Sequence, residues 1–446
     1  MKFGGTSVGS AERIEGVARL VRERLPRRPI VVVSAFARVT DMLIRAARLA
    51  EARDGGHAPL AAELRERHES VVRALVQEPQ ARQRLLGHVE ALSRELATLC
   101  TAVQQLGELT ARSLDAISAM GERLSYEIVA AALAERGVPT AAVDAREVLV
   151  TDESFGRATP DFEATGARAS ARLLPLIEKG CVPLLPGFVG ATPAGVTTTL
   201  GRGGSDWSAS ILGSVLGAEE IQIWTDVDGM MTVDPRLVAS ARVIPEVSFA
   251  EAAELAYFGA KVLHPATIRP AVERGIPVVV LNTLNPAAPG TRITETASAL
   301  EGEPRAIATK KGITVVMISQ PRMLFAYGFL ARVFEVFNRH RTPVDLIATS
   351  EVSVSLTIDN AERLEAIRRD LAELGEVQTL EQMAIVSVVG RGFTKRSGLA
   401  GRLFGALSEV NIVMISFGAS DVNVSFVVAE KDADTVVRTL HHAFFE

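Results

Sequence analysis

Over roughly the first 285 residues, apolar positions fall in short continuous runs that are separated by longer amphipathic stretches. Continuous apolar runs, without the alternation of a half-exposed strand, are typical of parallel strands covered on both faces. They predict strands at residues 29–35, 138–144, 181–186, 221–225 and 276–282. Helices are expected between them, for example at residues 10–25, 122–135 and 165–179. This order of elements predicts an α/β sandwich with a mainly parallel sheet.

Residues 57–106 depart from this alternation. The stretch is rich in Leu, Arg and Glu and contains no strand signal. We therefore expect a helical insertion on the surface of the α/β part.

The character of the chain changes after residues 284–305, which hold Pro, Gly and Thr without periodicity and form the best domain boundary. Beyond it, the order βαββα occurs twice. Residues 352–356 (VSVSL) match residues 422–426 (VNVSF), and Val333-Phe334 matches Leu403-Phe404 at the same offset. Two ferredoxin-like βαββαβ units are predicted.

Bulk properties narrow the class of protein. A chain of 446 residues is too long for a single core, so two or three domains are expected. A net charge of −5 gives no basic surface for nucleic acid, and no apolar run reaches the ~20 residues of a membrane span. We expect a cytoplasmic protein without nucleic-acid or membrane partners. Cys100 and Cys181 alone suggest neither a disulfide framework nor a metal site.

The stretch Thr197–Asp206 is the most informative one for chemistry, because three glycines and Arg202 stand among hydroxyl side chains. Gly203 and Gly204 have no Cβ, so backbone N–H groups can approach a bound oxyanion. Ser205 or Asp206 can cap the amphipathic helix that follows, and a helix N-terminus attracts anions. We predict a cradle for phosphate or carboxylate, with a plain glycine-rich turn as the alternative.

Four segments in this order resemble the aspartate kinase family within the amino-acid kinase superfold: residues 2–7 (KFGGTS), residues 197–206, residues 224–229 (WTDVDG) and residues 258–265 (FGAKVLHP). The C-terminal repeat resembles the paired ACT domains of that family. Residues 349–354 and 440–446 are most similar to its lysine-sensitive branch. The resemblance implies a three-layer catalytic sandwich over residues 1–290, with the 57–106 insertion, a linker at 291–310, and ACT domains at 311–380 and 381–446. An exchange of strands between the two ACT domains is left open.

The resemblance also implies a reaction, namely phosphorylation of the aspartate side-chain carboxylate by ATP. That carboxylate is already ionised at neutral pH, so no general base is required. Phosphoryl transfer is catalysed mainly by positioning and electrostatics, so cations and backbone donors are expected. The alternatives are another kinase of the superfold, acting on glutamate, carbamate or a nucleotide, and an amino-acid sensor whose kinase half has decayed.

The resemblance assigns roles residue by residue. The catalytic pair is Lys2 and Asp206. The nucleotide residues are Lys2, Gly4, Gly5, Thr225, Asp226, Met231, Arg236, Lys261 and Val262, with Gly4 and Gly5 supplying N–H donors. The aspartate residues are Ser34, Thr40, Glu122, Arg202, Gly203 and Ser205. Guanidinium binds carboxylate in a two-pronged fashion, which suits Arg202 to the α-carboxylate, and Glu122 suits the α-ammonium group. Mg²⁺ is expected on the ATP phosphates and water, without a firm protein ligand.

Each role has a plainer alternative. Lys2 and Arg236 could be solvated surface cations, Glu122 a carboxylate favoured by its helix dipole, and Asp206 a simple cap.

Regulation is expected at the ACT domains. The matching effector positions are Met323, Phe329, Leu330, Val344, Asp345, Ser350 and Glu351. Phe325, Ala326 and Pro343 stand where the lysine-sensitive pattern usually has hydrogen-bonding side chains. Lysine is therefore the leading effector, with threonine, another amino acid or loss of feedback left open. A homodimer through the ACT domains is expected, with a tetramer or a plain strand-edge interface as alternatives.

Overall fold

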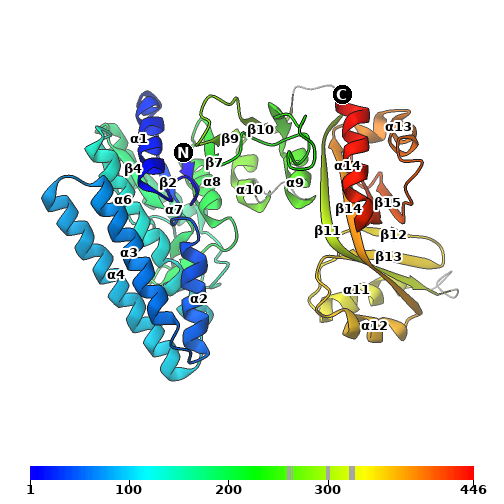
Figure 1. The fold of residues 1–446 in the computed structure, drawn as a ribbon, viewed down its shortest axis with the longest axis horizontal. Helices are drawn as coiled ribbons and strands as arrows, with labels where there is room; N and C mark the ends of the chain where they lie inside the picture. The colour runs from blue at the N-terminus through cyan, green and yellow to red at the C-terminus, as the bar shows by residue number, and fades with distance from the viewer. Residues whose placement is uncertain (259–262, 264, 298–301, 321–326) are drawn as a thin grey trace. The chain divides into compact units, whose positions relative to one another are not determined.

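The computed structural model describes residues 1–258, 263, 265–297, 302–320 and 327–446 (Figure 1). The chain divides into two compact units. The first comprises residues 1–230, 245–247 and 262–296, and the second comprises residues 231–244, 248–261 and 297–446.

The first unit is built on an eight-stranded sheet of order β3-β4-β2-β1-β7-β9-β10-β8. The six strands from β3 to β9 are parallel, and β10 runs antiparallel to β9. Their bounds are β1 Lys2–Phe3, β2 Val31–Val33, β3 Thr140–Ala142, β4 Val182–Pro186, β7 Ile221–Thr225, β8 Glu246–Ser248, β9 Val278–Asn282 and β10 Thr291–Thr294. The parallel strands are short, and those inside the sheet, such as β2 and β4, are buried throughout, which explains why they appear as continuous apolar runs.

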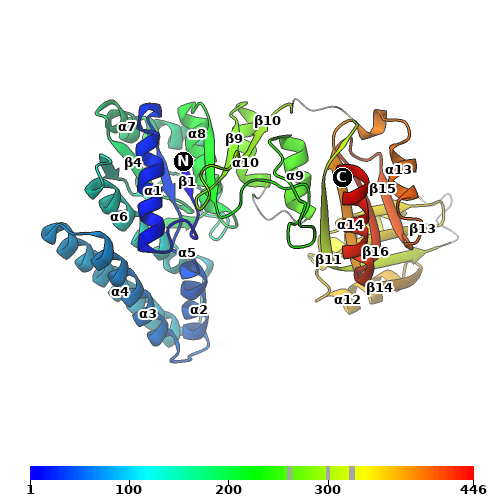
Figure 2. The ribbon, with the colours of Figure 1, turned by 45° about the horizontal axis from the view of Figure 1, so that its top comes forward.

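Two sets of helices cover this sheet. The connections β1–β2 and β2–β3 run in one direction along the sheet, whereas β3–β4, β4–β7 and β7–β9 run in the other. Right-handed crossovers therefore place α1 Ala11–Glu23 and α6 Met120–Glu135 on one face. The helices α7 Phe162–Glu178, α8 Gly204–Leu216 and α10 Pro265–Glu273 lie on the opposite face (Figure 2). This is the predicted three-layer α/β sandwich.

Residues 57–106 form two long helices, α3 His57–Leu75 and α4 Pro79–Leu106. Glu78 caps α4, Pro79 occupies its first turn, and Gly107 ends it with a φ of 70°. Leu64 and Leu85 belong to the same buried core as the sheet. The helices therefore pack on α2 Val39–Glu51 and α6 with one apolar face.

The second unit contains a six-stranded antiparallel sheet of order β12-β13-β11-β14-β16-β15. Its strands are β11 Pro304–Ser319, β12 Ile347–Thr349, β13 Ser353–Ile358, β14 Glu376–Gly390, β15 Met414–Phe417 and β16 Asn423–Ala429. Its helices are α9 Phe249–Phe258, α11 Phe329–Arg339, α12 Leu364–Ala372, α13 Leu399–Gly405 and α14 Glu430–Phe445.

The strands β11 and β14 are long because each serves both repeats. Residues 314–319 of β11 pair with β13, whereas residues 304–311 pair with the second half of β14, which in turn pairs with β16. One core lies around Val316 and Phe337, and the other around Val386 and Phe426. The first half of β11, which precedes the first repeat in the chain, thus belongs to the sheet of the second repeat.

This topology differs from two sequence expectations. The predicted linker at 291–310 contains β10 and the first half of β11, and β14 crosses the expected division at 380/381. The strand β11 continues through the polar segment Thr309–Gly312. It does so with a register shift after Lys311 and a positive φ at Gly312.

Candidate active site

A cavity of about 570 Å³ opens in the first unit, where β1 and its neighbours end. The chain leaves β1 in one direction along the sheet and later enters β7 on its other side, so this is a topological switch point, where open α/β sheets bind ligands. The predicted site residues that line the cavity are Lys2, Gly5, Ser34, Thr40, Glu122, Arg202, Gly203, Ser205 and Asp206.

Lys2 and Asp206 form an ion pair in this cavity. Lys2 Nζ lies 2.6 Å from Asp206 Oδ1, and the two side chains are only 11% and 13% exposed. Lys2 is fixed by the pairing of β1 with β2 and β7 on either side, and Asp206 by the first turn of α8. A Cβ on Gly4 would lie 3.6 Å from the ammonium group, which is ordinary van der Waals contact.

Of the two glycines after β1, Gly4 has a different task from the one expected. The N–H of Gly4 donates to the carbonyl of Trp224 at 3.1 Å, so it is engaged within the sheet and is not a spare donor for phosphate. A Cβ on Gly5 would lie 2.7 Å from the carbonyl oxygen of Ala35. Gly5 therefore lets the loop after β2 approach the loop after β1, and Ala37 N–H donates to its carbonyl.

The glycine-rich turn leads into α8, as predicted, but the cap residue is different. Gly203 occupies the cap position with a φ of 68°, so the helix begins at Gly204 and both Ser205 and Asp206 lie in its first turn. The prediction that Ser205 or Asp206 caps the helix was wrong, because a left-handed glycine starts it earlier. A Cβ on Gly204 would meet the Phe188 ring at 2.6 Å.

Arg202 brings a positive charge to the cavity, and Glu122 brings an acidic group. Arg202 is exposed on the glycine turn. Glu122 is buried on α6, and its Oε2 has no hydrogen-bond partner within the described residues. Burial raises the pKa of Glu122 to about 8, although a backbone hydrogen bond from Ala35 and the charge of Lys2 oppose the shift. A buried, unpaired carboxylate beside fixed cations is suited to an ammonium ligand.

Ser34 and Thr40 flank the loop that follows β2. The helical insertion braces this loop, since Arg67 Nη1 donates to the carbonyl of Ala37 at 2.7 Å. The imidazole of His68 stacks on Phe36 with ring centroids 4.7 Å apart. Burial lowers the pKa of His68 to about 4, so the ring is neutral at physiological pH.

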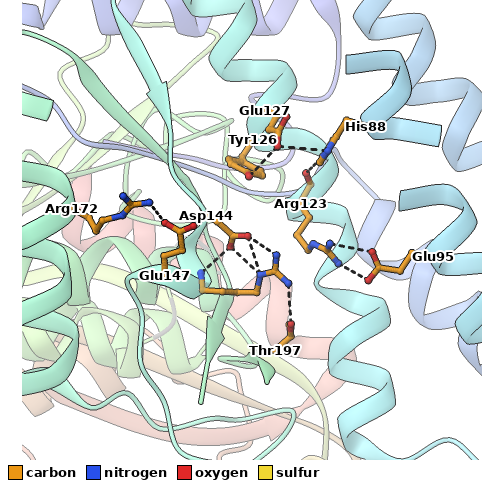
Figure 3. A network of polar contacts seen from close by, with 10 residues as sticks. His88, Glu95, Arg123, Tyr126, Glu127, Asp144, Glu147, Arg172 and Thr197 are labelled. Carbon is orange, nitrogen blue, oxygen red and sulfur yellow. Dashed lines mark hydrogen bonds and ion pairs between the residues drawn. The ribbon is translucent and has the colours of Figure 1, made fainter. Parts of the chain in front are cut away.

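A polar network beside the cavity ties the insertion to α6 (Figure 3). Arg123, next to Glu122, forms a fork of two hydrogen bonds, at 2.9 and 3.1 Å, with the Glu95 carboxylate of α4. Arg146 binds Asp144 in the same manner and reaches the hydroxyl of Thr197 at 3.5 Å. This outer network fixes the helix from which Glu122 points into the cavity.

Of the predicted nucleotide residues, Lys2 and Gly5 line this cavity. Thr225 ends β7 and Asp226 follows it in the first unit, where the Thr225 hydroxyl donates to Asp226 Oδ1 at 3.2 Å, and neither lines the cavity. Met231 and Arg236 belong to the second unit. The exposed guanidinium of Arg236 binds Asp234 at 2.6 Å. Lys261 and Val262 lie outside the described residues.

Asp115, Gly156 and Phe188 are among the residues of the cavity wall that sequence reasoning missed. Asp115 lies on the buried side of α5 Ala111–Ser118, together with Ile117 and Ser118. A carboxylate on the apolar face of a short helix was the available signal.

The predicted effector residues belong to the second unit. Phe329 and Leu330 begin α11, and Ser350 and Glu351 lie in the turn between β12 and β13. Val344 and Asp345 lie before β12. Met323, Phe325 and Ala326 lie outside the described residues.

Asp345 already holds an ammonium group from its own chain. Lys310 Nζ lies 3.1 Å from Asp345 Oδ1 and 2.8 Å from Asp359 Oδ2. The Tyr257 hydroxyl also donates to Asp345 Oδ1, and Lys310 Nζ lies 4.8 Å from the Tyr257 ring centre. The second oxygen of Asp345 is buried and has no partner within the described residues.

The described residues contain neither a membrane-spanning helix nor a cluster of metal-binding side chains. No helix there has the length and apolar character needed to cross a membrane. No group of three or more His, Cys, Asp and Glu side chains in that part of the chain could hold a metal ion.

Comparison with known proteins places this fold and site in a class. Residues 1–282 match the Amino acid kinase family, and residues 386–444 match an ACT domain. The chain is 38% identical over 465 residues to lysine-sensitive aspartokinase 3 of Escherichia coli, covering 100% of this chain and 98% of that protein. It is 40% identical over 463 residues to the chloroplastic aspartokinase 1 of Arabidopsis thaliana, covering 100% of this chain and 80% of the relative.

Solved structures agree. Escherichia coli aspartokinase III in complex with aspartate and ADP, in its R-state, matches with a TM-score of 0.85 at 37% identity, over 100% of this chain and 99% of that one. The same enzyme with lysine and aspartate, in its T-state, matches over the same shares at the same identity with a TM-score of 0.84. The fold is thus that of an amino-acid kinase with C-terminal ACT domains. This chain belongs to the aspartokinase family.

Proposed function

We propose that this chain transfers the γ-phosphoryl group of ATP to the side-chain carboxylate of L-aspartate, giving 4-phospho-L-aspartate and ADP. A carboxylate oxygen of aspartate forms the new bond to phosphorus, and the bond from phosphorus to the β,γ-bridging oxygen breaks. The observation that carries the proposal is one cavity that holds the Lys2–Asp206 pair, Arg202 on a glycine turn, and the buried Glu122. The arrangement matches the two ends of an amino-acid substrate and the charge of a transferring phosphoryl group.

Each residue has a task in this reaction. Arg202 binds the α-carboxylate in a two-pronged manner, and Glu122 binds the α-ammonium group. Gly203, Ser205, Ser34 and Thr40 complete the aspartate pocket. Lys2 stabilises charge that develops on the phosphoryl oxygens, and Asp206 holds the Lys2 ammonium group in place. No proton has to be removed from the nucleophile.

The nucleotide is proposed to lie against Gly4, Gly5, Thr225, Asp226, Met231, Arg236, Lys261 and Val262. Mg²⁺ fits this site as a companion of the nucleotide, because Asp206 is committed to Lys2 and the described residues form no carboxylate cluster of their own. Bound to the phosphates, Mg²⁺ would neutralise part of their charge.

Residues 1–290 are assigned the catalytic role, and residues 311–380 and 381–446 a regulatory one as ACT domains, with the chain acting as a homodimer through them. The relative with 38% identity is described as lysine-sensitive, which favours L-lysine as effector. The effector is proposed to bind at Met323, Phe329, Leu330, Val344, Asp345, Ser350 and Glu351. Activity measured against increasing lysine and threonine tests this, and flat curves for every amino acid would remove feedback control.

The activity itself is tested by ADP release from MgATP in the presence of aspartate, glutamate, carbamate or no acceptor. ADP release that depends on aspartate alone supports the proposal. Release that depends on another acceptor contradicts the substrate, and the absence of release with every acceptor favours an amino-acid sensor.

A further inference from the structure

Asp115 lies beside the substrate cavity and has no role in the reaction described above. Its side chain is buried, with 1% of the residue exposed, and it lines the cavity from α5. Within the described residues it forms no salt bridge. A buried carboxylate without a cationic partner is costly unless hydrogen bonds satisfy it. The hydrogen bonds that its oxygens accept therefore indicate its role.

The Asp115 carboxylate binds two separate segments of the cavity wall. Oδ1 accepts the hydroxyl of Thr199 at 2.7 Å, and Oδ2 accepts the N–H of the same residue at 2.8 Å. Oδ2 also accepts the N–H of Gly156 at 2.9 Å. One side chain thus joins the end of β6 Thr197–Thr199 to the turn around Gly156.

Thr199 and the buried Leu200, whose N–H donates to the carbonyl of Phe188 at 3.0 Å, are the last fixed points before the glycine turn. The carbonyl of Thr199 accepts the N–H of Ala158 at 2.9 Å, so every hydrogen-bonding group of Thr199 is used. Earlier in β6, Thr198 is tied to Thr151 through their hydroxyls at 2.6 Å. Thr197 receives the weaker contact from Arg146 (Figure 3). The chain then turns through Gly201 and Arg202 into α8.

The contact between the two segments is close. Gly201 has a φ of 78°, and a Cβ on it would lie 3.0 Å from the carbonyl oxygen of Gly156. The exposed Arg202 follows immediately and forms no ion pair within the described part of the chain. Its position is thus set by the backbone on either side of it, which is anchored at Thr199 and at the start of α8.

We propose that Asp115 is a positioning residue for aspartate binding, acting through Thr199 and Gly156 to hold the Arg202 turn. The inference rests on the proposed function, because it takes Arg202 as the ligand of the aspartate α-carboxylate. Asp115 itself touches no reacting atom. It sets the geometry of a bidentate contact, in which a small displacement weakens both hydrogen bonds.

The test uses the hydroxyl contact, because its removal leaves the two N–H groups that donate to Oδ2 in place. Thr199→Val deletes the donor to Oδ1 and keeps the shape of the side chain, whereas Thr199→Ser keeps the donor. We expect Thr199→Val to raise the KM for aspartate about tenfold, with less than about a twofold change in the KM for ATP, since loss of a hydrogen bond to a charged group has effects of that order. Thr199→Ser should restore the wild-type KM.

Asp115→Asn is the second variant. Its carbonyl oxygen can still accept both N–H groups, but the charge is lost and the NH2 group faces the Thr199 hydroxyl, so the KM for aspartate should rise by a factor similar to that in Thr199→Val. The two substitutions combined should not be additive, because they break the same contact. Asp161→Asn is the matched control. Asp161 caps α7 through Ala164 N–H at 2.9 Å and does not line the cavity, so its variant should lose stability without a shift in the KM for aspartate.

The outcomes separate this inference from the proposed function. Wild-type protein without aspartate-dependent ADP release would overturn the proposed function. Wild-type activity together with equal changes in both KM values, or with Thr199→Val and Thr199→Ser behaving alike, would overturn the role of Asp115 and leave the function intact. Additive effects of Asp115→Asn and Thr199→Val would also contradict it.

Discussion

The Lys2 ammonium group lies 2.6 Å from Asp206 Oδ1 inside the cavity of the first unit, although 204 residues separate the two in the chain. The strand β1 and the first turn of α8 each fix one partner by backbone geometry. The carboxylate keeps the ammonium group in one place before any substrate arrives, and a preorganised charge of this kind acts without reorganisation during the reaction.

Removal of the Lys2 charge should therefore act on turnover. We expect Lys2→Ala to lower kcat by about a hundredfold or more and to leave aspartate binding within about twofold, because the charge develops at the phosphoryl group. Steady-state kinetics and an aspartate titration by calorimetry measure both effects. Thermal unfolding provides the control for the buried Asp206 carboxylate that the substitution leaves unpaired. A variant that kept half of its kcat would contradict this role.

Arg202 should act on aspartate binding instead. In Arg202→Ala the KM for aspartate is expected to rise about tenfold to a hundredfold, with the KM for ATP changed by less than about twofold, since a bidentate charged contact is lost. Arg202→Lys should recover only part of the affinity, because an ammonium group cannot form the fork. Equal changes in the two KM values would count against the assignment.

Glu122 makes aspartate binding depend on pH. Burial raises the pKa of Glu122 to about 8 in the empty cavity, so the group is mostly protonated at neutral pH, whereas an ammonium ligand requires the carboxylate. The KM for aspartate should fall as the pH rises toward 8, by up to about tenfold per pH unit. Glu122→Gln should have a high KM that no longer varies over this range. A wild-type KM independent of pH below 8 would contradict the prediction.

The same group affects stability with a definite sign. The pKa of Glu122 is raised in the folded state from its ordinary value of 4.5 to about 8, so between these values the folded chain binds more protons than the unfolded chain. The contribution of Glu122 to the free energy of unfolding therefore decreases as the pH rises through this window. In Glu122→Gln the melting temperature should fall less between about pH 5 and pH 8 than in the wild type. Parallel curves for the two proteins would contradict the shift.

Lys310 is expected to compete with an effector at Asp345. The Lys310 ammonium group occupies one oxygen of Asp345, so an ammonium ligand has to bind against a site that is already neutralised. Lys310→Met should lower the lysine concentration for half-inhibition by about threefold or more, whereas Lys310→Arg should retain the competition. Activity without lysine serves as the control. An unchanged or raised half-inhibition concentration in Lys310→Met would contradict this view of the site.

Much of the fold could be predicted because local patterns of apolar residues indicate its strands and helices. The strand at residues 221–225 has the predicted bounds, and most others are shorter versions of the predicted runs, since buried parallel strands are apolar throughout. The sharing of β11 between both repeats could not be predicted. It depends on pairing between residues 304–311 and 384–390, and such distant pairing leaves no local signal.

The charged residues of the site could be predicted from the sequence, but the contacts that hold them in place could not. Lys2, Glu122, Arg202 and Asp206 stand in motifs, and the fold brings all four to one cavity. The task of Gly4 depends on the backbone that pairs with it, and that of Gly203 on its positive φ. The contacts of Asp115 and Lys310 join residues that are dozens of positions apart, so composition and spacing gave no indication of them.

The measurement that tests the central claim most directly is trapping of the product with hydroxylamine after incubation of the protein with MgATP and L-aspartate. An acyl phosphate reacts to give a hydroxamate, so we predict aspartyl hydroxamate that is formed only with both substrates and in proportion to the ADP released. ADP release without hydroxamate, or hydroxamate that does not depend on aspartate, would contradict the account.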